Sequence, residues 1–269
     1  MTSIINSLIP IILIILLGYG LKRSGRFTDG FWAGGETLTY YILTPALLVS
    51  VLASRPLGEL PWQKFLVTLD GTILLVAAII TIWQLAFRRL SPACFTSLFQ
   101  GGVRFNTFIA LALAGALLGE EGLRYSALAA TAMIILINVL CIGAFALSIR
   151  QNRFSFIAVF QQLLRNPLIL GCAGGLLLNL SGIGLHPSMA SMLDLVGRAA
   201  FPLGLLLVGS ALRFRGIFSA WELTLTSSLV QFLAKPLLAL MLIQWVGLSG
   251  VAAMVVVIFL CVPTAPSAY

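Results

Sequence analysis

Residues 97–119 read SLFQGGVRFNTFIALALAGALLG, a run that is apolar enough to lie in a membrane. It is interrupted by helix-weakening and polar residues: Gly101, Gly102, Arg104, Asn106 and Thr107. Adjacent glycines loosen a helix. A helix that starts at Cys94 reaches Asn106 after about 18 Å, just past the middle of a hydrocarbon core of about 30 Å. The stretch therefore predicts a spanning helix that breaks near the midplane of the bilayer.

The composition of the whole chain indicates the same environment. Of 269 residues, 60% are hydrophobic and 9% are charged, whereas soluble domains carry about 25% charged residues. The net charge of +8 is spread over short basic clusters between apolar runs, which is typical of membrane loops and not of a nucleic-acid-binding surface. We predict an all-α polytopic protein with the lipid bilayer as a partner and no nucleic acid.

Apolar runs of spanning length recur along the chain. Lys22 and Arg23 follow the first apolar run, whereas a signal peptide carries its positive charges before the apolar region. We therefore predict that this run is a retained span. Nine spans are predicted, at 3–21, 31–54, 65–87, 93–118, 125–149, 166–184, 190–212, 219–243 and 249–268.

Basic residues divide unevenly between the two sets of loops. One set holds ten: Lys22, Arg23, Arg26, Arg88, Arg89, Arg150, Arg153, Arg165, Arg213 and Arg215. The other set holds four: Arg55, Lys64, Arg124 and Arg198. Cytoplasmic loops carry the excess of Lys and Arg, which predicts a cytoplasmic-membrane protein with its N-terminus outside.

Catalytic and metal-binding patterns are missing from the sequence. The four cysteines lie in separate apolar runs without CxxC spacing, and His186 is the one histidine. No set of nucleophile, base and acid can be assembled. The sequence predicts no enzyme, no metal and no cofactor.

Several residues recur at a constant offset of 157 positions. Pairs at this offset are Pro10 and Pro167, Gly18 and Gly175, Ser24-Gly25 and Ser181-Gly182, Pro45 and Pro202, Leu48 and Leu205, Thr107 and Thr264, and Asn106 and Pro263. We predict two repeats, 1–150 and 151–269, each built on five spans and therefore inverted relative to one another. Inverted repeats build secondary transporters, although a duplicated bundle without a transport role is an alternative.

The second predicted break lies in VPTAP, where Pro263 and Pro266 each disturb helical geometry. Non-helical backbone at midplane depth lines a cavity or lies buried in protein. The predicted substrate-binding residues are those at the two breaks: Arg104, Asn106, Thr107, Pro263 and Thr264.

These polar residues also have structural interpretations. Asn106 and Thr107 could make hydrogen bonds that only pack helices. Arg104 could extend toward the cytoplasm or pair with Asp70. Lys235, which precedes a proline in the eighth span, is expected to extend outward to the membrane surface.

With these motifs the chain resembles the bacterial branch of the auxin efflux carrier family, which includes proteins described as malonate transporters. The likeness is strongest in QGGVRFNTFIALALAGALLG, RNPLILGCAGGLLLNLSGIGL, AAFPLGLLLVGSAL and VPTAPSAY. The resemblance implies ten spans in two inverted five-helix repeats, as in bile-acid-transporter-like folds, with helices 4 and 9 broken and crossing at the substrate. It also implies a small organic anion as substrate, elevator-like movement against a scaffold of spans 1, 2, 6 and 7, and homodimers through that scaffold.

Only nine spans are predicted, so the second repeat is expected to be truncated within its fourth helix, with the tenth helix missing. Compared with the first repeat, the second repeat is expected to lack roughly 40 residues. We therefore expect the 269-residue form to transport poorly compared with an extended chain. Two alternatives stay open: a truncated membrane protein that does not transport, and a sodium-coupled organic acid symporter of similar fold.

Overall fold

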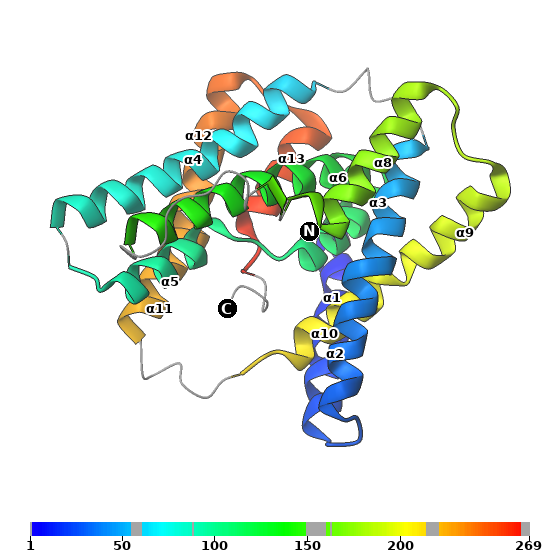
Figure 1. Ribbon diagram of the computed structural model, residues 1–269, viewed down its shortest axis with the longest axis horizontal. Helices are drawn as coiled ribbons and strands as arrows, with labels where there is room; N and C mark the ends of the chain where they lie inside the picture. Colours follow the sequence, from blue (N-terminus) through cyan, green and yellow to red (C-terminus); the bar gives the residue numbers. More distant parts are fainter. Residues whose placement is uncertain are drawn as a thin grey trace. The chain divides into compact units, whose positions relative to one another are not determined.

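The computed structural model describes residues 2–54, 61–87, 89–148, 160, 161, 163–213 and 221–264, and of residues 2–4 and 147 the backbone alone. All regular structure within these ranges is helical (Figure 1). Six helical stretches are long and apolar enough to cross a membrane, and Pro167–Ser181 and Gly250–Cys261 are shorter apolar helices. These eight segments overlap all nine predicted spans, because the stretch Pro92–Ala146 covers both the fourth and the fifth. The prediction of an all-α polytopic membrane protein is confirmed.

The chain forms two compact units. Unit 1 comprises Met1–Leu60, Thr107–Thr131 and Leu164–Leu212, and unit 2 comprises Pro61–Asn106, Ala132–Leu163 and Arg213–Tyr269. Each unit therefore takes helices from both predicted repeats. Spans 1, 2, 6 and 7, which the family resemblance groups as a scaffold, all fall in unit 1, together with parts of spans 4 and 5.

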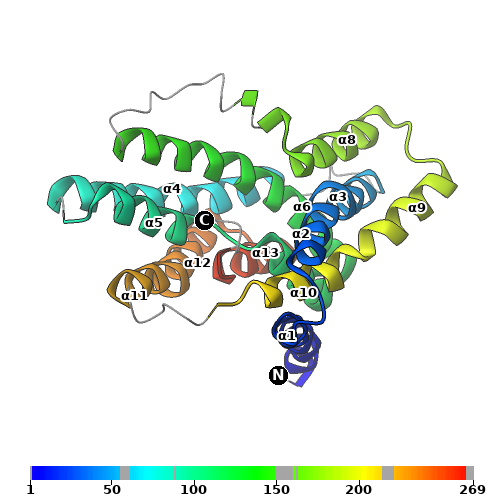
Figure 2. The same cartoon turned by 60° about the horizontal axis from the view of Figure 1, so that its bottom comes forward.

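Unit 1 contains seven helical segments and the beginning of another. They are α1 (Thr2–Arg23), α2 (Asp29–Leu38), the π-helical turn η1 (Thr39–Leu43), α3 (Thr44–Ala53), α8 (Pro167–Ser181), α9 (Pro187–Arg198), α10 (Ala200–Ser210) and the first part of α6 (Thr107–Ser148). In Figures 1 and 2, α1 runs beside α10 and α3 runs beside α8.

Unit 2 contains the other described helices. They are α4 (Trp62–Phe87), α5 (Pro92–Val103), α11 (Trp221–Leu229), the π-helical turn η2 (Val230–Ala234), α12 (Lys235–Val246), α13 (Gly250–Cys261) and the remainder of α6. Helices α4 and α12 are antiparallel neighbours: a Cβ at Gly71 would lie 3.5 Å from Leu242, and one at Gly247 would lie 4.0 Å from Lys64.

Local sequence explains where several helices begin. Proline at the first helical position follows a capping side chain at Ser91-Pro92, Asn166-Pro167 and His186-Pro187. Proline is suited to this position because its missing N–H would lack a helical partner anyway. The Asn166 side chain accepts from the backbone N–H groups of Leu168 and Ile169, and such a cap is worth about 1 kcal/mol.

The two Ser-Gly pairs at the offset of 157 form the same turn after α1 and after α8. Gly25 and Gly182 both have φ of 68°, a left-handed conformation that glycine adopts without strain. Ser24 Oγ donates to the carbonyl of Leu21 at 2.8 Å, and Ser181 Oγ donates to the carbonyl of Leu178 at 3.0 Å. Leu21 and Leu178 are themselves 157 positions apart, so the same hydrogen bond recurs at this offset in both turns.

Glycines at the same offset also pack equivalently inside unit 1. A Cβ at Gly18 would lie 2.1 Å from the carbonyl oxygen of Leu206, and one at Gly175 would lie 3.1 Å from the Cα of Val49. Val49 and Leu206 differ by 157 positions. Two helix pairs, α1 with α10 and α3 with α8, therefore approach closely through glycines 157 positions apart.

Candidate functional site

The first break separates α5 from α6. Helix α5 ends at Val103, Arg104 is extended with φ −72° and ψ 163°, and α6 begins at Thr107. Gly102 lies in the last turn of α5, where a Cβ would come within 2.8 Å of Ile80 and 3.0 Å of Val230. The adjacent glycines thus serve close helix packing in unit 2, and the break begins after them, at Arg104.

The second break follows α13. This helix ends at Cys261, and Val262 is extended with φ −75° and ψ 149°. Pro263 is exposed and Thr264 is half-buried, while Pro266 lies outside the described residues. The rings of Phe105 and Phe259, one from each break region, lie 5.4 Å apart between centroids. Unit 2 therefore brings the ends of α5 and α13 together.

Lys235, the first residue of α12, is fully buried beside these breaks, so the expectation that it extends outward is wrong. Its Nζ donates to the carbonyls of Gly102 and Arg104, both at 3.3 Å, and to Oε1 of Gln231 at 2.9 Å. The carbonyls in the last turn of a helix have no acceptor role inside that helix. The carbonyls of Gly102 and Arg104 are therefore available to accept from the Lys235 ammonium. These hydrogen bonds stabilise the buried charge, because a buried charge without a partner is costly.

Gln231 extends this contact to the second break. Its side-chain Nε2 donates to the carbonyl of Val262, directly after α13. Gln231 lies in η2 and is 3% exposed, four residues before Lys235. The two side chains therefore link the end of α5 to the end of α13.

The residues predicted at the site fall in both units. Arg104, Asn106, Pro263 and Thr264 belong to unit 2, and Thr107, the first residue of α6, groups with unit 1. Asn106 is 1% exposed. Sequence reasoning did not find Lys235 and Gln231 as parts of the site, although two polar residues four positions apart in an apolar span are a signal for a shared helix face.

Arg104 is half-buried, and its Nε is buried without a hydrogen-bond partner among the described residues. Its side chain neighbours the thiol of Cys141 on α6. Asp70 on α4 keeps Oδ1 buried and unpaired within the same described part of the chain. Among the described residues no ion pair joins Arg104 and Asp70, so the alternative in which they pair is not realised.

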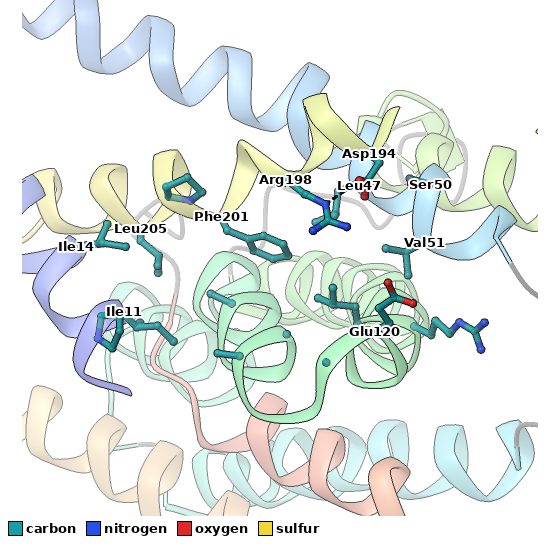
Figure 3. A pocket seen from close by; sticks show the side chains of 18 of the residues that line it. Ile11, Ile14, Leu47, Ser50, Val51, Glu120, Asp194, Arg198, Phe201 and Leu205 are labelled. Atoms are coloured by element: carbon teal, nitrogen blue, oxygen red, sulfur yellow. Dashed lines mark hydrogen bonds and ion pairs between the residues drawn. The ribbon is translucent and has the colours of Figure 1, made fainter. Parts of the chain in front are cut away.

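Unit 1 contains a cavity of about 790 Å³ (Figure 3). Its walls come from α1, α3, α6, α9 and α10, with apolar side chains such as Ile11, Val51 and Phe201. Charged residues also line it: Glu120, Arg124, Asp194 and Arg198. Arg198 Nε donates to Asp194 at 2.7 Å, and Figure 3 shows the carboxylate of Glu120 on the opposite wall from Arg198.

A glycine shapes the α6 wall of this cavity. Gly119 has φ of 64° and ψ of −148° within α6, so the helix kinks there and Glu120 follows directly. A side chain at this position would be strained. The cavity was not predicted from the sequence, because its walls combine residues from five helices that are far apart in the chain.

A comparison with curated proteins gave no match. A family model described as "Membrane transport protein" matches residues 3–269, nearly the whole chain. The match agrees with the helical fold and the spanning segments described above. The chain belongs to this membrane transport protein family, the family of the auxin efflux carriers.

Proposed function

We propose that the chain moves small organic anions, such as mono- or dicarboxylates, across the cytoplasmic membrane and binds them at the two helix breaks. The transported anion would contact Arg104, Asn106 and Thr107 at the first break and Pro263 and Thr264 at the second. This function involves binding and movement only, with no enzymatic step, as befits a transporter family.

The observation that carries this function is the buried ammonium of Lys235 at the first break, which Gln231 links to the second. Its acceptors are two backbone carbonyls and one amide oxygen. Among the described residues, no carboxylate pairs with it. The breaks are therefore built around a positive charge without a protein anion to balance it, which favours a negatively charged substrate.

The start of α6 adds to this preference. The N–H groups of its first turn have no intrahelical acceptors, and they carry the positive end of the helix dipole. They begin at Thr107, immediately after Asn106, whose side-chain amide is also a donor. A carboxylate at the break would accept from such groups, as substrate carboxylates do at the broken helices of transporters.

The movement of the anion is proposed to be elevator-like. The division into two compact units, one of which gathers spans 1, 2, 6 and 7, supports this part of the mechanism. We propose that the anion passes through the cavity of unit 1, because its apolar walls and charged residues suit an organic anion.

The proposal also covers the orientation of the chain in the membrane and its assembly. The excess of basic residues in one set of loops supports a position in the inner membrane with the N-terminus outside. A homodimer through the helices of unit 1 is proposed from the family resemblance.

Uptake into proteoliposomes tests the function. Purified protein is reconstituted, and entry of radiolabelled malonate is followed with unlabelled acetate, succinate or the neutral malonamide as competitors. We expect saturable uptake above protein-free liposomes that carboxylates reduce and malonamide does not. Equal competition by malonamide, or uptake no faster than in protein-free liposomes for every labelled acid, would contradict the proposal.

A further inference from the structure

We propose that Lys235 is a resident cation that occupies the place of a coupling ion, so that the site assembles without Na⁺. In carriers with broken helices, unwound carbonyls and the C-terminal ends of half-helices coordinate the coupling Na⁺. Here the corresponding groups are already occupied by an ammonium of the chain itself. The consequence for transport rests on the function proposed above, whereas the assembly does not.

The acceptors of Lys235 have the chemistry of a sodium site. They are the carbonyl oxygens of Gly102 and Arg104 and the amide oxygen of Gln231. Alkali and other hard cations prefer oxygen ligands of this kind. The carbonyl of Gly102 lies in the last turn of α5, and Arg104 is the first residue after this helix. The negative end of the α5 dipole therefore also faces the ammonium.

The same ammonium contributes to holding the two broken helices together. Lys235 fixes the amide oxygen of Gln231, which leaves the amide nitrogen to donate to Val262. The orientation of the Gln231 amide is thereby determined, because only one of its ends can face a cation. A charge at the end of α5 therefore positions a donor at the end of α13.

The local helix geometry supports this double role. Gln231 lies in η2, a π-helical turn within an otherwise α-helical span, and Lys235 directly follows this turn. π-Turns are rare and occur often at functional sites. Lys235 is followed by Pro236, and a proline at this point of the helix removes one intrahelical N–H.

With Lys235 bound to these oxygens, the site does not need Na⁺ to assemble. A cation already balances the carbonyls at the end of α5, and a second one beside it would be repelled at close range. Removal of the ammonium would leave three oxygens without their cation. A small side chain at position 235 should therefore create a binding site for Na⁺.

Thermal unfolding of the purified full chain tests this inference without any organic anion. The wild type, Lys235→Ala and the control Lys64→Ala are compared in NaCl and in choline chloride at equal ionic strength. Lys64 is an exposed lysine on α4 of the same unit. Choline is too large to replace an ammonium between three oxygens.

We expect the wild type and Lys64→Ala to have the same Tm in both salts. Lys235→Ala should melt lower by roughly 5 °C or more in choline chloride and regain at least half of this loss in NaCl. A wild-type Tm that rises specifically with Na⁺ would overturn the inference, and this arm does not depend on the variant folding. Lys235→Ala that melts like the wild type in choline chloride, or that gains nothing from Na⁺, would also overturn it.

Discussion

The Nζ atom of Lys235 lies 3.3 Å from the carbonyl oxygen of Arg104, at the first residue after α5. The two residues are separated by 131 positions in the chain, and one begins a helix while the other follows the end of one. Backbone groups freed by a break inside a membrane protein must find a partner within the protein. The ammonium group of Lys235 is that partner, and it places a positive charge at the first break.

Replacement of Asn106 by alanine is expected to weaken anion binding while the protein stays folded. The side-chain amide lies at the break, immediately before α6, where it can donate to a carboxylate. The loss of one such hydrogen bond to a charged group corresponds to about 1.5–3 kcal/mol, or roughly 10-fold or more in affinity. Titration of malonate against the purified variant measures this change.

Asn179→Ala is the matched control for Asn106→Ala. Asn179 on α8 donates to the carbonyl of Leu52 on α3 at 2.8 Å, a packing contact within unit 1. Its removal should lower stability by about 1–3 kcal/mol and leave anion affinity unchanged. If Asn106→Ala behaves like this control, with lower Tm and normal binding, Asn106 is a packing residue only.

Arg104→Gln should also lower the affinity for carboxylates. The guanidinium is half-buried, with Nε unpaired among the described residues, and its positive charge lies at the first break. Arg89→Gln serves as a control because Arg89 is exposed in the loop before α5. We expect a weaker affinity in the first variant and no change in the second when both are titrated with malonate. Equal affinities in the two variants would remove Arg104 from the site.

Gly18→Ala should destabilise the protein, because its Cβ would lie 2.1 Å from the carbonyl oxygen of Leu206. Overpacking of this kind costs about 1–3 kcal/mol. Gly20→Ala on the same helix has nothing within 4 Å of the new Cβ and should be neutral or slightly stabilising. The Tm values of the two variants check the packing of α1 on α10. Equal Tm values would contradict that packing.

Filling the cavity of unit 1 should slow transport without unfolding the protein. Ala116 lines the cavity on α6 and is exposed, so Ala116→Trp occupies its space without displacing a buried core. Ala93→Trp, at an exposed position near the start of α5, is the control. We expect a several-fold lower initial rate of malonate uptake for Ala116→Trp alone. A normal rate would place the substrate path elsewhere.

The helical architecture was predictable from the sequence because it depends on local properties. Apolar length gives the spans, and proline and glycine mark helix ends such as Gly25 and Gly182. The break after Cys261 follows the proline signal in VPTAP. Gly101 and Gly102, by contrast, remain helical, because α5 packs against neighbouring side chains there and the helix ends after them.

The environment of Lys235 could not be predicted in this way. A lysine in a membrane helix extends its long side chain toward the surface when nothing nearby accepts its hydrogen bonds. The acceptors on Gly102 and Arg104 lie more than 130 positions away and are backbone atoms, which leave no mark in the sequence. The cavity in unit 1 was unpredictable for the same reason, since packing between distant helices creates it.

Binding of carboxylates to the wild type and to Asn106→Ala tests the placement of the anion most directly. Each purified protein is screened by thermal shift against mono- and dicarboxylates, with neutral amides of the same size and Asn179→Ala as references. We predict that at least one carboxylate raises the Tm of the wild type and of Asn179→Ala, and that Asn106→Ala loses this response. A carboxylate that stabilises Asn106→Ala as strongly as the wild type would contradict a substrate site at the helix breaks.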